Sequence, residues 1–352
     1  MKILQKYLSI NLAAATLVAM AGLVALFSFF SIIDQLAETG RGGYTVGEAL
    51  LYVLLTTPRL AYELFPIASV IGSMATLGML AHSSELVVIR TSGVSKVNLA
   101  SMLTKAALLL IILAVAIGEF VAPVSEEAAQ QRRSMAMTDQ ITMKTRDGYW
   151  ARDGGSFINI KKILPGNRVE DVYIYEFDQG NRLRSSIHAR DASYNNQRWQ
   201  LHDIEQTSIS TDKIAIQHYR EAEWPSLLEP EIINFVTVQP QYLSLLGLFK
   251  YIGYLRQNAL ETAPYDQALW KKLIKPFSIC AMVLLAILLV RCEARFAPVG
   301  QRIFVGSLIG IVFHIIDQIS GHLGLVYDIP AYFSVTAPTV VLSGIVIYLI
   351  LR

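Results

Sequence analysis

Three carboxylates lie close to the ends of long apolar runs, where their ionised form could do chemistry. They are Asp34, Glu119 and Asp317, and they occur in the pairs Asp-Gln, Gly-Glu and Asp-Gln. A charged side chain in lipid is costly, so each is expected to face protein or water. Capping and hydrogen bonding between helices are the favoured roles. A proton relay is the alternative, and it would require a continuous chain of exchanging groups.

Basic residues form a second set near the ends of the same runs: Arg41, Arg59, Arg132, Arg133, Lys271, Lys272 and Lys275. Arg59 stands out because it follows Pro58 inside an apolar stretch. Such side chains can extend to lipid headgroups. They can also form a ring that binds the phosphates of an anionic lipid, because guanidinium groups contact phosphate through two hydrogen bonds. The lipid-binding candidates are Arg41, Arg59, Arg132, Arg133 and Lys272.

No catalytic motif occurs in the sequence. A Walker loop, G-x-S-x-G, H-E-x-x-H and paired cysteines at metal spacing are all absent. His188, His202 and His218 are scattered, and we expect them to be packed or solvated. Cys280 and Cys292 are expected to be plain structural residues. We therefore expect a protein that is not an enzyme and that needs no cofactor.

A short polar connection at 82–93 separates two apolar runs. Ser83 or Ser84 can cap a helix, Glu85 suits its positive end, Arg90 its last turn, and Gly93 its stop. The helix has only two to three turns and would not be stable alone in water. We expect it to dock on a cytoplasmic partner, an ATPase subunit. The candidate coupling residues are Glu85, Leu86, Val88, Ile89 and Arg90.

The composition places the chain in the membrane class, with 53% hydrophobic and 16% charged residues. A net charge of +2 gives no nucleic-acid signature. Six spans are predicted, and the first is too long for a secretory signal. Pro58 and Pro66 are expected to kink the second span, and Gly72 to allow close helix packing. The apolar runs cover 8–33, 46–81, 97–121, 274–290, 303–319 and 331–351.

Alternating polar and apolar residues between about 139 and 240 predict an all-β domain, a sandwich or β-roll. The fold class is thus a membrane α-helical bundle with an inserted β domain. We divide it into spans one to three (1–138), the β domain (139–240), an amphipathic helix (241–264) and spans four to six (265–352). The positive-inside rule puts both termini in the cytoplasm and the β domain in the periplasm.

Several stretches in register resemble the LptF/LptG family of permease subunits of the lipopolysaccharide export transporter. They are Ile33-Asp-Gln-Leu36, Ser84-Glu-Leu-Val-Val88 with Ser92-Gly93, Gly118-Glu-Phe-Val-Ala-Pro123, Gly148-Tyr-Trp-Ala151, and Asp317-Gln318 with Val326-Tyr-Asp-Ile-Pro330. The resemblance covers the whole chain. The Asp-Gln and Gly-Glu-x-Val-Ala-Pro motifs favour the LptG branch, and the paralogous LptF branch is the alternative.

The resemblance implies a heterodimer with LptF, an LptB ATPase dimer that binds the ATP and Mg, and LptC. It also implies a periplasmic β-jellyroll that continues through LptA toward the outer membrane, with lateral gates at the first and fifth spans. Glu85 matches the acidic residue of the family's coupling helix, and Arg59, Arg133 and Lys272 match basic positions near the lipid cavity. Where other members carry a lysine pair after Asp-Gln-Leu, this chain has Ala37-Glu38, so Arg41 would have to substitute.

The function expected from these features is a permease subunit that takes lipopolysaccharide from the bacterial inner membrane and passes it to the periplasmic bridge. Phe27, Phe30, Phe313 and Ile316 are candidates for contact with the acyl chains, although core packing explains them equally well. One rival is a membrane-anchored periplasmic binding or assembly protein without a transport cycle. A second rival is an ion- or proton-coupled transporter that uses Asp34, Glu119 and Asp317.

Overall fold

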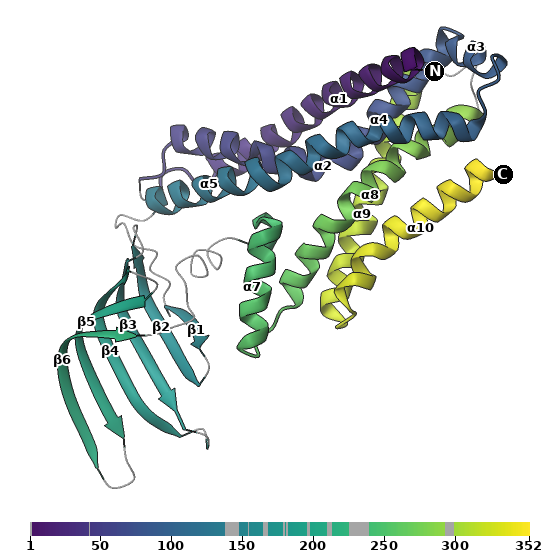
Figure 1. Cartoon of the computed structure of the whole chain (residues 1–352). Helices are drawn as coiled ribbons and strands as arrows, with labels where there is room; N and C mark the ends of the chain where they lie inside the picture. Colours follow the sequence, from purple (N-terminus) through teal and green to yellow (C-terminus); the bar gives the residue numbers. More distant parts are fainter. Residues whose placement is uncertain are drawn as a thin grey trace.

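The protein folds into a helical bundle that carries a β domain at one end (Figure 1). The computed structural model describes residues 2–352 except 42, 138–147, 154, 165–167, 179, 181, 196–197, 210–212, 225–238 and 293–298. Six helical stretches are long and apolar enough to cross a membrane. This confirms the predicted fold class. The stretches are α1 (Lys2–Leu36), α2 (Val46–His82), α4 with α5 (Lys96–Ala116, Ala122–Met137), α8 (Ala263–Cys292), α9 (Val299–Val326) and α10 (Ala331–Leu351).

Helix α2 is the centre of the bundle, because it contacts α1, α5, α8 and α9 and most of its length is buried. It continues as one helix through Pro58 and Pro66, and the kinks expected at these prolines stay a prediction. The close packing expected at Gly72 is confirmed. A Cβ added there would lie 2.5 Å from the Thr16 Cα of α1. Both α1 and α9, on the flanks of α2, leave most of their apolar surface exposed.

Gly72→Ala is therefore expected to destabilise the bundle by about 1–3 kcal/mol, because the new methyl group overlaps the backbone of α1. Thermal unfolding of the purified full-length chain in detergent measures the effect. Gly22→Ala is the matched control, since Gly22 lies inside α1 with no atom within 4 Å of an added Cβ. Equal unfolding midpoints for the two variants would contradict the packing role of Gly72.

The third span contains one irregular turn that the sequence pattern did not predict. Between α4 and α5, residues Ile117–Val121 form a π-helix, η1. The helix then continues through Pro123, as expected from the polar segment that follows. An added Cβ at Gly118 would lie 2.5 Å from the Tyr62 ring of α2, so glycine is required for this approach. π-Helical turns inside α-helices frequently mark functional positions.

The β domain consists of one antiparallel sheet in the order β1-β2-β3-β4-β5-β6. The alternation predicted from the sequence is present in the inner strands, where Ile158, Ile160, Val172 and Ile174 face a common core. The jellyroll closure stays a prediction, and the domain boundary at 139 lies outside the described residues. The strands are β1 (Tyr149–Asp153), β2 (Ser156–Leu164), β3 (Arg168–Phe177), β4 (Leu183–Asn195), β5 (Arg198–Ile209) and β6 (Ile214–Trp224).

Helix α7 (Leu245–Gln257), preceded by the 3-10 turn η2 (Pro240–Tyr242), links the sheet to the bundle. The amphipathic spacing predicts one apolar face at positions 242, 245, 246, 249 and 252. Of these, Ile252 is buried, whereas Leu246 and Phe249 are exposed. Tyr251, Tyr254 and Leu255 are buried in the core of the sheet instead. The Tyr254 hydroxyl donates to the Arg152 carbonyl at 2.9 Å. Burial raises the pKa of Tyr254 to about 12, so this phenol stays neutral and keeps its proton for the hydrogen bond.

The short helix α3 (Glu85–Thr91) lies at the opposite end of the bundle, near both chain termini (Figure 1). Leu86 and Ile89 are buried against the bundle, whereas Val87 and Val88 are exposed. The Glu85 carboxylate accepts hydrogen bonds from Tyr7 at 3.1 Å and from Ser83 at 3.0 Å. Gly93 takes φ +89°, as expected for a helix stop. The Arg90 side chain lies outside the described part.

Candidate functional site

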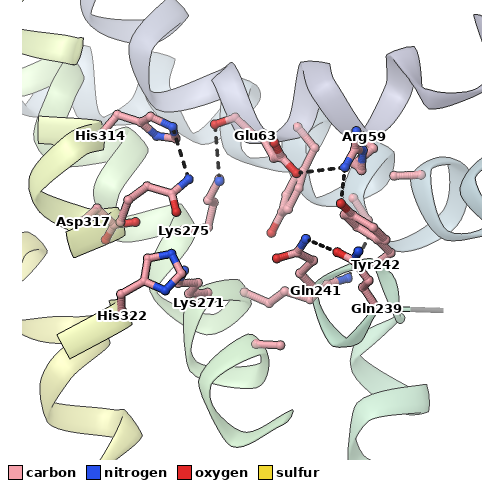
Figure 2. Close-up of a pocket in the computed structure, with 16 residues that line it drawn as sticks. Arg59, Glu63, Gln239, Gln241, Tyr242, Lys271, Lys275, His314, Asp317 and His322 are labelled. Carbon is pink, nitrogen blue, oxygen red and sulfur yellow. Dashed lines mark hydrogen bonds and ion pairs between the residues drawn. The ribbon is translucent and has the colours of Figure 1, made fainter. Parts of the chain in front are cut away.

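A polar cavity of about 510 Å³ opens between α2, α8 and α9 on the β-domain side of the bundle. The turn η2 and the π-helix η1 complete its wall. Figure 2 shows that Lys271, Asp317 and His322 come from α8 and α9 and lie across the cavity from Arg59 and Tyr242. Four cations and two carboxylates line the cavity: Arg59, Lys271, Lys272 and Lys275, and Glu63 and Asp317. An anionic group is therefore the ligand class that the lining favours.

Arg59 is held on three sides, which fixes its guanidinium at the edge of the cavity. Its Nε lies 3.3 Å from Glu126, whose side chain is almost fully buried on α5. Glu63, one turn further along α2, lies 3.9 Å away. The guanidinium also donates to the Tyr242 hydroxyl and stacks 4.5 Å from the centre of that ring. A guanidinium has five donors, so it can bind a phosphate while it keeps these partners.

Lys272 lines the cavity, but its ammonium is already bound within the chain. Its side chain is only 6% exposed, and its ammonium lies 2.7 Å from Glu119 and 3.1 Å from the Gly118 carbonyl. The other oxygen of Glu119 accepts the Leu245 backbone N–H at 2.7 Å, at the start of α7. One carboxylate in the π-helix therefore ties α7 and α8 together. Of the three predicted carboxylates, Glu119 has the interhelical role that was favoured over a proton relay.

Lys271 and Lys275 differ from the other cations because neither makes an ion pair within the described part of the chain. Lys275 donates to the Glu63 carbonyl at 3.4 Å and lies 4.8 Å from the centre of the Tyr62 ring. Both line the cavity. Their ammonium groups are consequently the charges that a bound anion could neutralise without displacing a carboxylate.

The predicted basic set contains all four cations of this cavity, with Arg59 and Lys272 among the lipid-binding candidates, but most of the other lining residues were not predicted. Tyr62, Glu63, Tyr242, His314 and His322 also line the cavity. One signal was available, because 314, 317, 318 and 322 repeat at helical spacing within an apolar span. Asp317 belongs to this polar stripe, whereas Asp34 is exposed on α1. The three predicted carboxylates thus lie in three different surroundings.

The remaining basic candidates lie elsewhere. Arg133 forms an ion pair with Glu38 on α1 and lies over the Tyr52 ring. Arg41 and Arg132 are exposed and are not among the residues that line the cavity. Glu38 stands where the resemblance led us to expect a lysine, and it neutralises Arg133. The cationic lining therefore comes from α2 and α8 rather than from α1 and α5.

The four apolar candidates divide between two surfaces. Phe27 and Phe30 are exposed on α1, and Ile316 is exposed on α9. Phe313 instead packs against the bundle core and lines a small cavity of about 50 Å³ that adjoins Lys275. The exposed positions suit contact with lipid or with another membrane helix, whereas Phe313 suits contact with whatever enters the polar cavity.

Comparisons with known proteins agree with this architecture over its whole length. Residues 6–352 match the family described as lipopolysaccharide export system permease LptF/LptG. The chain is 31% identical over 353 residues to lipopolysaccharide export system permease protein LptG of Escherichia coli K12, covering 99% of this chain and 98% of that protein. It is 29% identical over 351 residues to the LptG protein of Haemophilus influenzae, with the same coverage. The chain therefore belongs to the LptF/LptG family of lipopolysaccharide export system permeases.

Proposed function

We propose that the chain is the LptG-type permease subunit of an ATP-driven exporter that extracts lipopolysaccharide from the bacterial inner membrane. The observation that carries the proposal is the cationic cavity of about 510 Å³, enclosed by three membrane-spanning helices in a chain of this family. A phosphorylated glycolipid has the matching chemistry, because its phosphates are anionic and its acyl chains are apolar. The relatives named LptG support the branch assignment.

Lipid phosphates are proposed to bind Lys271, Lys275 and Arg59, the three cations that can accept an anion without losing a buried partner. The acyl chains would lie along Phe27 and Phe30 of α1 and Ile316 of α9, whose apolar side chains are exposed. Lys272 has a positioning role in this arrangement, because its ammonium is engaged by Glu119.

The end that carries α3 and both termini is proposed to face the cytoplasm, where Val87 and Val88 meet an LptB-type ATPase dimer. The ATPase would bind the ATP and Mg and hydrolyse the nucleotide, so the permease chain itself is not catalytic. The β domain would lie in the periplasm and pass the lipid toward an LptA bridge. LptF and LptC are the other proposed partners.

The proposal is tested by photocrosslinking from a benzoylphenylalanine placed at position 241 of the full-length chain, in membranes that contain lipopolysaccharide. Lys271→Glu with Lys275→Glu is expected to reduce the lipopolysaccharide adduct about tenfold or more, because two attractive charges become repulsive. Arg132→Glu with Arg41→Glu is the matched control, since it makes the same charge change outside the cavity. An undiminished adduct in the lysine variant would exclude this cavity as the lipid site.

A second arm of the experiment tests the transport cycle. In vesicles that hold the complete transporter, added ATP is expected to reduce the adduct at position 241, because the lipid leaves the cavity. A binding protein without a cycle would give an adduct that does not respond to ATP. That result would contradict the permease proposal and favour the membrane-anchored binding protein.

A further inference from the structure

A second cavity, of about 600 Å³, lies on the β-domain side of the bundle, where α8 begins and α9 turns into α10. On α8, its residues 263, 266, 267 and 270 are displaced around the helix from the lysines of the first cavity. The two cavities therefore lie on different faces of α8. The inference below goes beyond the proposed function, because it does not depend on lipopolysaccharide.

The lining of this second cavity carries negative charge. Glu261, Asp266 and Asp328 line it, against a single cation, Arg256. Arg256 is already paired with Asp266 at 2.9 Å, and Asp266 also accepts the Thr262 hydroxyl at 2.7 Å. Glu261 and Asp328 make no ion pair within the described residues. Phosphate or carboxylate ligands are disfavoured here, and a cationic group is favoured.

A buried amide provides an independent observation that points to a ligand. Gln267 lines the cavity and is 8% exposed, yet its side chain makes no hydrogen bond to any described residue. Its Nε2 lies over Gly321 of α9, where an added Cβ would come within 2.7 Å. The amide oxygen of Gln267 can therefore accept a hydrogen bond from a ligand in the cavity.

Two aromatic rings complete the site and are of the type found at membrane surfaces. Trp270 of α8 and Tyr332 of α10 lie 6.2 Å apart at 59°. Aromatic rings of this kind are enriched where a membrane meets water. Exposed apolar side chains surround them at the α9–α10 turn: Val326, Tyr327, Ile329 and Phe333. These exposed apolar side chains suit contact with lipid beside the cavity.

We propose that this cavity binds the ammonium headgroup of a zwitterionic phospholipid. A primary ammonium has three N–H donors. The cavity offers three acceptors that have no partner among the described residues: Glu261, Asp328 and Gln267. The rings of Trp270 and Tyr332 add attraction between a cation and aromatic faces. The phosphate next to the ammonium would lie near Arg256. One nitrogen of this guanidinium is paired with Asp266, and its other N–H groups could contact the phosphate.

Native mass spectrometry of the full-length chain released from mixed vesicles tests this site. The vesicles contain equal amounts of phosphatidylethanolamine, phosphatidylcholine and phosphatidylglycerol, and no lipopolysaccharide. Phosphatidylethanolamine is expected to be retained about fivefold more than the other two, which corresponds to about 1 kcal/mol. Phosphatidylcholine lacks the N–H donors, and phosphatidylglycerol lacks the ammonium. Equal retention of the three lipids would overturn the proposal.

Glu261→Gln with Asp328→Asn is expected to reduce the retention of phosphatidylethanolamine to that of the other lipids, and so is Gln267→Leu. Asp34→Asn with Glu127→Gln is the matched control, because it removes two exposed carboxylates on α1 and α5, which do not line this cavity. A preference that survives in the site variants would place the lipid elsewhere and overturn the proposal. If the site variants instead lose a co-purifying protein and retain the lipids unchanged, the proposal is also overturned. The cavity would then bind a basic side chain of that protein. Because the lipopolysaccharide adduct is measured separately, failure here leaves the permease proposal standing.

Discussion

Glu119→Gln is expected to reduce the free energy of unfolding by about 3–5 kcal/mol, because it leaves the Lys272 ammonium buried without a carboxylate. The two groups lie 2.7 Å apart, and the Lys272 side chain is 6% exposed. An amide oxygen still accepts a hydrogen bond, but it does not neutralise the charge. Thermal unfolding of the full-length chain in detergent measures the loss, which is large for a single substitution.

A double variant separates the charge effect from a packing effect. Glu119→Gln together with Lys272→Met removes both charges while it keeps two side chains of similar volume, so most of the stability is expected to return. Lys272→Met alone leaves Glu119 with the Leu245 N–H as its one partner among the described residues. If Glu119→Gln has the unfolding midpoint of the natural chain, or if the double variant is no better than the single one, the pair does not hold the junction.

The same pair shows what sequence patterns can and cannot predict. Long apolar runs, with turn residues between them, are sufficient to predict all six spans and the position of the β domain. They do not predict the π-helix at Ile117–Val121, whose residues Gly118 and Glu119 contact three other helices. Such contacts depend on three-dimensional packing and leave no periodic signal.

The candidate site was predicted in part for a related reason. Basic residues in or beside an apolar run are visible in the sequence, so all four cations of the cavity stood in the predicted basic set. Whether a cation is available to a ligand depends on which carboxylate lies beside it. Arg133 is neutralised by Glu38, 95 positions away along the chain, whereas Lys271 and Lys275 make no ion pair with a described residue. The charged residues can be read from the sequence, but their ion pairs depend on the three-dimensional structure.

Helix α7 buries residues that its amphipathic spacing does not predict, because it has two partners. An amphipathic pattern assumes one apolar face, and for this helix the predicted face included Leu246 and Phe249. The structure buries Leu248 and Ile252 against α8 and Tyr251 and Tyr254 against the sheet. The predicted apolar face did not include these two tyrosines. In the structure they join the bundle to the β domain.

Val88→Asp is expected to reduce co-purification of the ATPase about tenfold or more, because a charge would have to be buried in the proposed contact. Val88 is 65% exposed on α3, so the fold of the chain should tolerate aspartate. Affinity purification of the transporter, with the ATPase quantified per permease chain, measures the effect. Leu351→Asp is the matched control, since Leu351 is an exposed apolar residue at the same end of the bundle. Equal losses in both variants would contradict a specific contact through α3.

Glu85 needs a different design, because its carboxylate is already bound within the chain by Tyr7 and Ser83. Glu85→Ala is expected to reduce ATPase binding, but it also removes the link between α1 and α3. Tyr7→Phe removes the hydrogen bond of that link and leaves the Glu85 charge in place. If Glu85 acts on the partner, Tyr7→Phe keeps the ATPase bound. If the two variants lose it equally, Glu85 serves to hold α3 on its own bundle, and the exposed valines alone carry the proposed contact.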